Sequence, residues 1–252
     1  MKKTLLFLVL GIGLLLSGCF QIHRTIFLEK NGSGKLVQKV LFYSYFVMGT
    51  EAENYDAEKL TREAPNYGEG VRYVSSEKAT DGDMTGYEVT YAFDDISKLK
   101  LSTDPGSDLF SMGVGDDKEY ITFLFKKGKV AELTVIMPRE NVSEDETEPV
   151  EPEDDEGVFD DEDNWDMTKN LFLQMRLSTR IIVKGKITGS DADHVHNNEV
   201  ILEELDFGEM MKDEEVERKM KKQQNNLDIK SFEEKVKGCI LESKEKITIK
   251  FN

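Results

Sequence analysis

Residues 86–93 read Gly-Tyr-Glu-Val-Thr-Tyr-Ala-Phe, and this stretch decides the fold class. Its odd-numbered residues are large and apolar, whereas its even-numbered residues are small or polar. A period of two places one set on each face of a β-strand, so the aromatic set is expected to face a core. Residues 71–76 form a candidate partner strand, and Asp-Gly-Asp at 81–83 lies near the turn. The pattern therefore predicts a β-hairpin.

Two more hairpins are predicted on either side of this one. Residues 22–48 contain an Asn-Gly-Ser-Gly turn at 31–34 between two apolar runs, the second of which is unusually aromatic. Residues 121–136 contain Lys-Lys-Gly-Lys at 126–129 between two alternating runs. Because hairpin turns join most of the strands, an antiparallel sheet is favoured. Further strands are expected at 180–187, 200–202 and 247–251.

Helices are expected between and after these strands. Thr50 and Glu53 form a capping box at the start of residues 51–63, and Asp206 can cap a long helix through Met220. The expected fold is therefore α+β, an antiparallel sheet built from sequential hairpins with inserted helices and a helical C-terminal third. A short helical turn and two further helices are expected at 96–101, 167–176 and 232–237.

Residues 140–166 differ sharply in composition from the rest of the chain. Fifteen of them are Asp or Glu, none is Lys or Arg, and Pro149 and Pro152 interrupt the run. Such a segment cannot bury a core and repels itself when compact, so a disordered acidic insert is predicted at 140–163. We interpret it as a long loop within a single ectodomain of residues 19–252, with a division into two domains as the alternative.

The N-terminus carries the pattern of a bacterial signal peptide. Lys2 and Lys3 precede an almost wholly apolar run, residues 4–16, which is too short to span a bilayer comfortably. The run ends in Leu-Ser-Gly-Cys at 16–19, which reads as a lipobox. A lipoprotein signal peptide is therefore predicted at residues 1–18. The alternative is an ordinary secretory signal followed by an incidental cysteine.

This signal resembles that of bacterial lipoproteins, and the resemblance implies the fate of Cys19. It implies cleavage between Gly18 and Cys19, a diacylglyceryl group on the Cys19 thiol, and acylation of the new amine by a fatty acid such as palmitate. Two acyl chains anchor a protein stably, because each buried methylene contributes about 0.8 kcal/mol. The expected location is the cell envelope. Phe20, in place of Asp, follows Cys19, which favours the outer membrane facing the periplasm if the host is Gram-negative.

The mature chain is expected to be strongly acidic. Removal of residues 1–18 leaves 234 of the 252 residues, with 31 Lys and Arg against 50 Asp and Glu and a formal net charge of −19. Such a surface is repelled by nucleic-acid phosphates and by anionic lipid headgroups, so a nucleic-acid partner is excluded and the body is expected to be held near the membrane by its lipid anchor alone. Once Cys19 is acylated, Cys239 has no partner for an intramolecular disulfide. It is then either buried or available for an intermolecular disulfide, and its apolar neighbours predict that it is buried.

The densest cluster of metal-ligand residue types is Asp191, Asp193, His194 and His196. His194 and His196 would share one face of a strand, from which both could reach a zinc ion. However, this run is expected to be a polar connection between strands, and zinc needs at least three protein ligands. The other histidine, His23, is distant in the sequence. The interpretation that we favour is a solvated loop, and no metal or other cofactor is predicted.

Other motifs of known chemistry are incomplete in this chain. Residues 81–86 imitate the first half of an EF-hand loop, but Ala92 occupies the position of the final Glu, so a hairpin turn is favoured. The chain has no Gly-x-Ser-x-Gly elbow, no Ser-x-x-Lys pair and no phosphate-binding Gly-rich loop. No catalytic residue is assigned, and we expect a protein that is not an enzyme.

The order of features after the lipobox resembles that of the LppM-like envelope lipoproteins. The resemblance rests on the hairpin with its Gly-Ser-Gly turn at 32–34, the Gly-Tyr-Glu-Val-Thr-Tyr-Ala-Phe-Asp-Asp-Ile run at 86–96, and the strand, polar connection and strand at 180–202. It implies an α+β ectodomain and lipid binding without catalysis. The acidic insert and the predicted helical C-terminal third depart from the family, and no site residue is carried over from it.

Two functions of different classes agree with these observations. The first is a lipid-anchored, non-enzymatic envelope lipoprotein that binds a hydrophobic ligand or a protein partner. Its aromatic strands, at 41–47, 87–93 and 120–125, would line an apolar cavity or, alternatively, an ordinary core. The second is a cation-responsive interaction module in which residues 140–166 recruit calcium or a basic partner. A metal-dependent enzyme would be a third class, and it needs zinc on His194 and His196.

Overall fold

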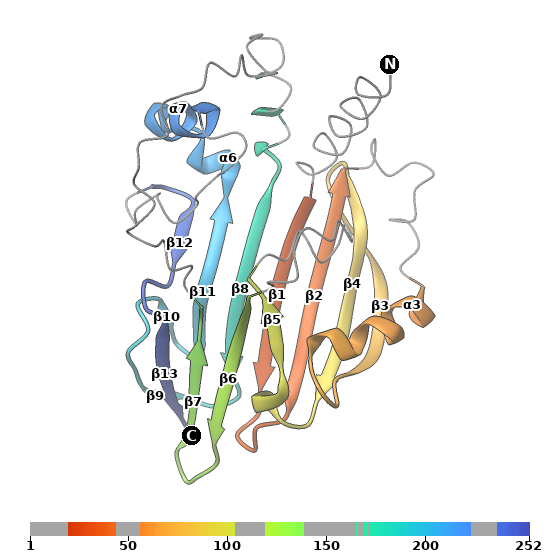
Figure 1. Ribbon diagram of the computed structural model, residues 1–252, viewed down its shortest axis with the longest axis vertical. Helices are drawn as coiled ribbons and strands as arrows, with labels where there is room; N and C mark the ends of the chain where they lie inside the picture. The colour runs from red at the N-terminus through yellow and green to blue at the C-terminus, as the bar shows by residue number, and fades with distance from the viewer. Residues whose placement is uncertain are drawn as a thin grey trace, which may run out of the picture.

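The computed structural model describes residues 20–43, 56–103, 119–138, 165, 169–170, 172–222 and 236–252. These residues form an 8-stranded sheet and a 5-stranded sheet. The large sheet has the strand order β10-β11-β8-β1-β2-β4-β3, with β12 also paired to β11, and the small sheet has the order β5-β6-β7-β13-β9. In Figure 1 the long strands of both sheets run roughly along the long axis of the molecule.

The strands range in length from two to ten residues. Those of the large sheet are β1 (Phe20–Leu28), β2 (Gly34–Tyr43), β3 (Arg72–Asp81), β4 (Met84–Phe93), β8 (Arg176–Val183), β10 (Val195–His196), β11 (Glu199–Asp206) and β12 (Cys239–Leu241). Those of the small sheet are β5 (Lys100–Ser102), β6 (Tyr120–Lys126), β7 (Ala131–Ile136), β9 (Ile187–Ser190) and β13 (Lys246–Phe251). The three predicted hairpins are confirmed as the antiparallel pairs β1–β2, β3–β4 and β6–β7.

Strand β4 contains the alternating stretch that predicted the fold class. Tyr91 and Phe93 are at most 2 % exposed and face the core, as expected. Gly86 lets β2 approach closely, because a Cβ at this position would lie 2.0 Å from the Val40 carbonyl oxygen. Gly82 has a φ of 55° in the β3–β4 turn, a conformation that glycine adopts without strain. The hairpin therefore combines the predicted strand periodicity with a turn that glycine makes possible.

Strand β1 pairs in parallel with β8, which lies 155 residues later in the chain. The pairing runs from Gln21 opposite Arg176 to Leu28 opposite Val183. The other pairings among the described strands are antiparallel. The large sheet is therefore mixed, and the prediction of a purely antiparallel sheet is wrong at this pairing. Parallel neighbours are joined by long connections, so no local turn signal marks them in the sequence.

The predicted α+β fold with a helical C-terminal third is wrong, because the described chain is mostly β. The long helix expected from Asp206 to Met220 is broken after Met210. A second helix, α7 (Glu214–Lys222), starts after Asp213, whose carboxylate accepts a 2.9 Å hydrogen bond from the Glu215 amide. The chain then returns to the strands β12 and β13. The described helices are α3 (Ala57–Glu63), α6 (Phe207–Met210) and α7 (Glu214–Lys222), with the 3-10 turns η2 (Ala64–Tyr67) and η3 (Ile96–Lys98).

Helix α3 begins later than the sequence predicts. Asp56 is its N-cap, and the Asp56 carboxylate accepts a hydrogen bond from the Glu58 amide at 3.1 Å. The predicted capping box of Thr50 and Glu53 lies outside the described residues. The η3 turn confirms the short helical turn that was expected at 96–101.

Two boundaries near β8 also differ from the prediction. The strand expected at 180–187 is divided, because β8 ends at Val183 and Gly185, with a φ of 134°, leads into β9. The helix expected at 167–176 ends early, since Arg176 already begins β8. Within the described part of that helix, the Leu173 amide donates to the Lys169 carbonyl oxygen at 3.0 Å.

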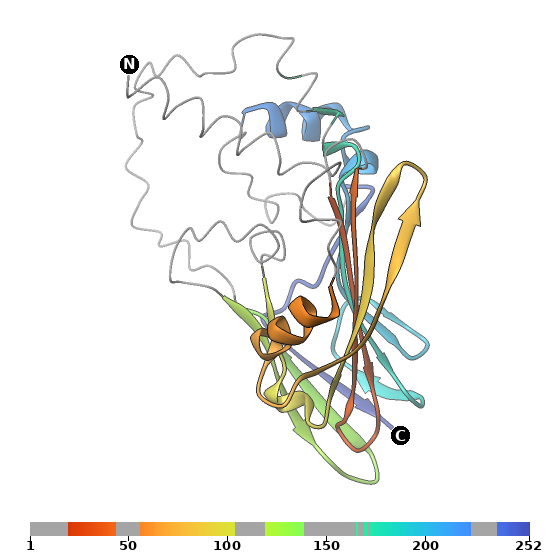
Figure 2. The same ribbon diagram turned by 90° about the vertical axis from the view of Figure 1, so that its right-hand side faces the viewer.

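Two hydrophobic clusters cover one face of the large sheet, which we call the inner face. Figure 2 shows the large sheet nearly edge-on, with the small sheet leaning against the lower half of the inner face. The lower core lies between the two sheets and includes Ile26, Leu36, Tyr91, Phe123, Leu133 and Ile249. The upper core lies beneath α6 and α7 and includes Ile22, Val40, Trp165, Leu205, Phe207 and Met220. The small sheet therefore covers only one of the two clusters.

Several predicted segments lie outside the described residues. They are the signal peptide with Cys19, most of the acidic insert, most of the loop expected at 102–117, and most of the helix expected at 232–237. No helix in the described part of the chain is both long and apolar enough to cross a membrane.

Candidate functional site

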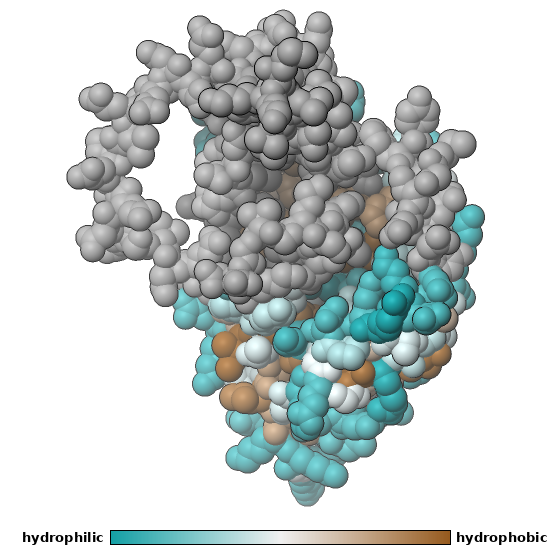
Figure 3. All heavy atoms as spheres, turned by 45° about the vertical axis from the view of Figure 1, so that its right-hand side comes forward, coloured by the Kyte–Doolittle hydropathy of each residue, from teal (hydrophilic) through white to brown (hydrophobic). Residues whose placement is uncertain are grey.

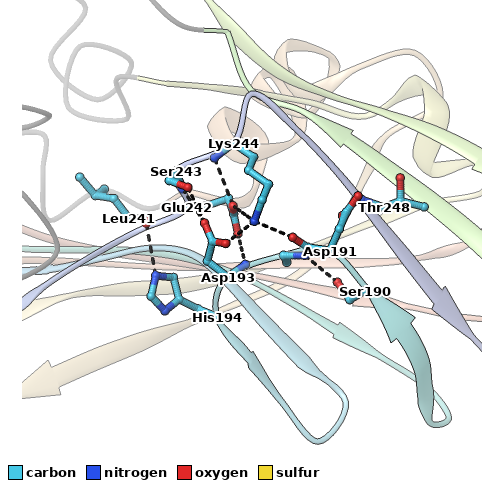
Figure 4. A network of polar contacts seen from close by, with 10 residues as sticks. Ser190, Asp191, Asp193, His194, Leu241, Glu242, Ser243, Lys244 and Thr248 are labelled. Atoms are coloured by element: carbon cyan, nitrogen blue, oxygen red, sulfur yellow. Dashed lines mark hydrogen bonds and ion pairs between the residues drawn. The ribbon is translucent and has the colours of Figure 1, made fainter.

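The cluster that the sequence singled out, residues 191–196, connects β9 to the β10–β11 hairpin and lies against the β12–β13 connection (Figure 4). The Asp193 carboxylate is at its centre, where it contacts the Lys244 ammonium and accepts a 2.5 Å hydrogen bond from Ser243 Oγ. The same ammonium donates to the Asp191 carbonyl oxygen at 2.7 Å. These contacts tie the connection to a segment about fifty residues later in the chain.

Two more carboxylates extend this network. The Glu242 carboxylate accepts hydrogen bonds from the backbone amides of Asp193 at 2.8 Å and Lys244 at 3.2 Å. Asp191 Oδ1 accepts one from the Thr248 amide at 2.5 Å, within β13. All three carboxylates are thus engaged by protein donors. We call the group the loop clasp: Asp191, Asp193, Glu242, Ser243 and Lys244.

The pKa values in the loop clasp follow from these contacts. Hydrogen bonds from Lys244 and Ser243 hold the pKa of the Asp193 carboxyl well below its usual range. Burial raises the pKa of the Glu242 carboxyl, and the hydrogen bond to Asp193 raises the pKa of the Lys244 ammonium. The loop clasp therefore contains an ion pair between Asp193 and Lys244 beside the Glu242 carboxyl, whose pKa is raised. Protonation of Asp193 would weaken this ion pair.

The histidines are not drawn together around a common point. His194 Nε2 lies 3.3 Å from the Leu241 carbonyl oxygen, and His196 is exposed on the short strand β10. His23 lies on β1, where its Nδ1 is 2.9 Å from Ser178 Oγ and burial lowers its pKa. Within the residues that the structure describes, no group of three or more His, Cys, Asp or Glu is placed to hold a metal ion.

A second cluster, which the sequence analysis missed, crosses the inner face between the two cores. Glu203, Thr179, Arg24 and Gln38 lie in one register on β11, β8, β1 and β2. Each is the direct cross-strand neighbour of the next, so the four side chains share a face and form a row. We call these four residues the polar row. The residues in register on either side of it are largely apolar and belong to the upper and lower cores.

Arg24 is the centre of the polar row and is only 3 % exposed. Its Nη1 donates to the Ser102 carbonyl oxygen at 2.7 Å, and its Nε and Nη2 donate to Thr179 Oγ1 at 3.1 and 2.8 Å. Nη2 also lies 3.9 Å from a carboxylate oxygen of Glu203. These partners matter because a buried charge without compensation costs on the order of several kcal/mol. The polar row is therefore a compensated charge between two apolar clusters.

The other end of the polar row meets a group of tyrosines. The Tyr67 hydroxyl donates to Gln38 Oε1 at 3.1 Å, and the Tyr67 ring packs against that of Tyr91 with centroids 4.9 Å apart. Burial raises the pKa of the Tyr87 and Tyr91 hydroxyls, and the proximity of Tyr67 and Glu63 raises it further. Burial also raises the pKa of the Glu63 carboxyl. At this end of the polar row, the raised pKa values therefore favour the neutral, protonated forms of the tyrosine hydroxyls and of the Glu63 carboxyl.

The sequence did contain a signal for the polar row. Arg24 stands between Ile22 and Ile26 in an alternating run, at a position where the pattern calls for an apolar residue. Thr179 interrupts the same kind of pattern between Leu177 and Ile181 in β8. A charged residue on the apolar face of a strand indicates a buried, partnered charge.

The upper core is rich in methionine. Its single aromatic indole, Trp165, is 5 % exposed, and the Trp165 Nε1 lies 3.4 Å from Glu217 Oε1 on α7. Lys169 pairs with the same Glu217 carboxylate oxygen at 2.5 Å. Methionine is flexible and polarizable, so a cluster of it adapts to varied apolar shapes. The buried methionines of the upper core are Met175, Met210, Met211 and Met220.

The remaining predicted residues have structural surroundings. Cys239 is 5 % exposed in β12, which confirms its predicted burial, and burial raises the pKa of its thiol. Residues 81–86 make the β3–β4 turn and the start of β4, so the hairpin interpretation of the EF-hand-like stretch is confirmed. Gly18 and Cys19 lie outside the described residues.

The described surface of the lower half is mainly hydrophilic on the side seen in Figure 3, with scattered hydrophobic residues. Of the aromatic residues of β4 and β6, Tyr91, Phe93 and Phe123 lie buried in the lower core. Isolated apolar residues of this kind are normal on a soluble surface and need no partner. The exposed large hydrophobic residues are Phe27, Val74, Leu124 and Val130.

A scan against models of protein families found no match, and a search of curated proteins found none either. One solved structure that matches is the NMR structure of the folded domain of LppM from Mycobacterium tuberculosis. The match covers 76 % of this chain and 84 % of that chain, with 8 % sequence identity and a TM-score of 0.33. At this TM-score and identity the similarity is weak. The resemblance to LppM-like lipoproteins stays a prediction.

Proposed function

We propose that this chain is a lipid-anchored, non-enzymatic protein of the bacterial cell envelope, which binds a hydrophobic ligand or a protein partner at its upper core. The observation that carries the proposal is the lipobox at 16–19, which ends one residue before β1 begins at Phe20. A signal of this composition supports lipidation of Cys19 and export of the residues that follow it. The anchor would then hold the whole body at the membrane.

The upper core is the part of the body that is best suited to binding. The small sheet packs against the lower core, where the aromatic side chains of β4 and β6 fill the space between the sheets. The upper core has instead α6, α7 and four buried methionines over the same sheet. Methionine side chains are flexible and polarizable, so these buried ones can rearrange around an apolar ligand, which supports this region as its site.

The titratable groups of the described chain support a role without catalysis. Groups with shifted pKa values are found at functional sites but also in structural ion-pair networks. Asp193 and Lys244 belong to the loop clasp, and Tyr87 and Tyr91 owe their shifts first to burial. Each of these shifts has a structural cause, so none of them requires a reaction to explain it.

The anchoring half of the proposal is tested by comparing the chain with its Cys19→Ser variant in the same host. We expect the natural chain in the membrane fraction after cleavage before Cys19, and the variant unprocessed or released from the membrane. Cys19→Ser keeps the charge and the size of the side chain, so it isolates the thiol. Equal membrane association of the two chains would contradict lipid anchoring.

The binding half is tested by native mass spectrometry of residues 19–252 with Cys19→Ala, purified without detergent or chelator. We expect an added mass that matches a lipid, and we expect Met211→Gln to reduce its occupancy because an amide replaces an apolar group that is 4 % exposed. Val130→Gln is the matched control, since Val130 is 46 % exposed in the lower half. A bare polypeptide mass would contradict a hydrophobic ligand, and a calcium or zinc adduct of fixed stoichiometry would favour a cation-binding role.

A further inference from the structure

We propose that the outward face of the small sheet docks an acidic segment of the same chain, residues 140–156. The segment follows β7 in the chain and lies outside the described residues. The recognising groups are lysine side chains of the small sheet, and the groups that they bind are carboxylates. Such docking is separate from the proposed function, since it needs neither the lipid anchor nor a hydrophobic ligand.

The small sheet has one face in the lower core and another that points away from the large sheet (Figure 2). Buried residues alternate along β6, β7 and β13 with residues that are at least partly exposed, so the second set shares the outward face. Two rows of cross-strand neighbours on this face lie four residues apart along β13, a distance of about 13 Å. The first row is Lys100, Thr122, Ile136 and Lys246, and the second row is Lys126, Glu132 and Lys250.

Lysine side chains lie at the corners of this face. Lys126 and Lys246 are exposed, and neither makes an ion pair within the described part of the chain. Lys250 lies 3.5 Å from the Glu132 carboxylate, and the Lys100 ammonium lies 4.5 Å from the centre of the Tyr120 ring. The β6–β7 turn adds two more exposed lysines beside the second row. We call the whole set the lysine face: Lys100, Lys126, Lys127, Lys129, Lys246 and Lys250.

Acidic residues on and around the lysine face are fewer than the lysines. Glu132 lies within the second row, and Glu119, Asp191 and Glu245 lie next to the ends of β6, β9 and β13. The Asp191 carboxylate is already engaged by a backbone amide of β13, as part of the loop clasp. Six lysines therefore face four carboxylates, so the lysine face keeps an excess of positive charge in an acidic chain.

The composition of residues 140–156 and their place in the chain select them as the occupant. They contain ten Asp and Glu residues and no Lys or Arg. They begin four residues after Ile136, which ends β7 and belongs to the first row of the outward face. Fifteen of the 50 acidic residues lie in 140–166, which leaves 35 against 31 Lys and Arg in the rest of the mature chain. The strongest concentration of negative charge in the chain thus starts beside its lysine face.

The covalent connection favours binding within one chain. A tethered partner has an effective concentration on the order of millimolar, and the seventeen residues of the segment are far more than are needed to span about 13 Å. Each exposed ion pair is weak, so docking depends on several pairs that form together. Salt screens such pairs, because the Debye length falls from about 10 Å at 0.1 M to about 3 Å at 1 M. Docking should therefore be strong at low salt and lost at high salt.

The test is zero-length crosslinking of the full mature chain with a water-soluble carbodiimide, followed by peptide mass spectrometry of the monomeric product. The reagent joins a lysine amine to a carboxylate in contact with it, with loss of water and without a spacer. At low salt we expect Lys126, Lys246 and Lys250 to be joined to carboxylates of residues 140–156. At about 1 M salt these crosslinks should fall by about tenfold. Lys35 and Lys78, which are exposed on the large sheet, should not be joined to the segment.

A charge-neutral variant gives a second readout that does not depend on crosslinking. In it, the ten Asp and Glu residues of 140–156 are replaced by Asn and Gln, which keeps the length of the segment. We expect the lysine face to be acetylated at low salt about threefold faster in this variant than in the natural chain, because its amines are no longer paired. Lys35 and Lys78 are the internal controls, since they report any effect of the changed net charge on distant amines. Their rates should be the same in both chains.

Three results would overturn the docking. They are crosslinks from the lysine face to Glu132 and the marginal carboxylates alone, crosslinks to residues 140–156 only between different chains, and acetylation that becomes faster to the same degree at the control lysines. None of these results would affect the proposed function, which depends on the acylation of Cys19 and on the mass of a bound ligand.

Discussion

Substitution of Arg24 by methionine keeps the length of a buried side chain but removes its charge and its donors. In the folded protein Arg24 is 3 % exposed, and its guanidinium serves the Ser102 carbonyl oxygen and Thr179 Oγ1 with three hydrogen bonds. The variant leaves those acceptors without these donors and leaves the Glu203 carboxylate without the cation that lies 3.9 Å away. We therefore expect Arg24→Met to be strongly destabilising.

The size of the effect follows from how deeply the pair is buried. Removing one partner of a fully buried ion pair costs about 3–5 kcal/mol, because the other charge stays uncompensated. The Glu203 side chain is 21 % exposed, so water solvates part of its charge and the lower end of this range applies. We expect Arg24→Met to lower the free energy of unfolding by about 3 kcal/mol.

Urea unfolding followed by Trp165 fluorescence measures this change, and Arg218→Met on α7 is the matched control. Arg218 is exposed, so the same chemical change there should alter the free energy of unfolding by less than about 0.5 kcal/mol. A double-mutant cycle with Glu203→Gln adds a second criterion. The double variant should be more stable than additivity predicts, by about 1–3 kcal/mol, since it also removes the carboxylate charge that faces the guanidinium.

The reasoning would be refuted if Arg24→Met cost less than about 1 kcal/mol, or if its effect and that of Glu203→Gln were additive within about 0.5 kcal/mol. Either result would mean that the polar row is not a compensated buried charge. A cost of that size would instead be typical of a single exposed hydrogen bond.

Three further predictions concern other parts of the structure. The folded-state pKa of the Asp193 carboxyl lies below its unfolded value, so the stabilising effect of the ionised carboxylate is complete above about pH 4 and is lost on acidification. Between about pH 5 and 2, the free energy of unfolding should therefore fall less in Asp193→Asn than in the natural chain. Equal pH dependences in the two chains would contradict this. Gly86→Ala would place a Cβ 2.0 Å from the Val40 carbonyl oxygen. We expect it to lower the free energy of unfolding, measured in urea, by about 1–3 kcal/mol. An unchanged urea midpoint would argue against this close approach. Burial and a raised pKa should make the Cys239 thiol react with a thiol reagent much more slowly in native protein than in urea, and similar rates would contradict its burial.

The hairpins were predictable from sequence because their signals are local. The alternation at 86–93 fixes which residues of β4 face the core, and glycine-rich turns at 31–34 and 81–83 mark where the chain reverses. Pairing within a hairpin depends on residues that are close in the chain, so a short window of sequence contains the required information.

The parallel pairing of β1 with β8 could not be predicted in this way. The two strands lie 155 residues apart, and each has a pattern that any neighbouring strand could satisfy. The helical C-terminal third failed for a different reason. The run from Asp206 to Met220 is rich in helix-forming residues, but the chain turns between α6 and α7, and Asp213 caps α7. Asp is a weak helix former inside a helix and a strong N-cap, so this residue starts a second helix instead of continuing the first.

The candidate sites show the same division between local and long-range information. Composition located Asp191, Asp193 and the nearby histidines, but the clasp that engages the carboxylates depends on Ser243 and Lys244 from a distant segment. The polar row was missed, because its members come from four strands and only their register brings them together. A single out-of-pattern residue, Arg24 in β1, was its one local sign.

The central claim is that the chain is held in the cell envelope by acyl groups on Cys19. The mass of the N-terminal peptide of the chain, isolated from membranes of its host, tests this claim most directly. We expect a peptide that begins at Cys19 and carries a diacylglyceryl group. A peptide that begins at any other residue, or one with an unmodified Cys19, would contradict it.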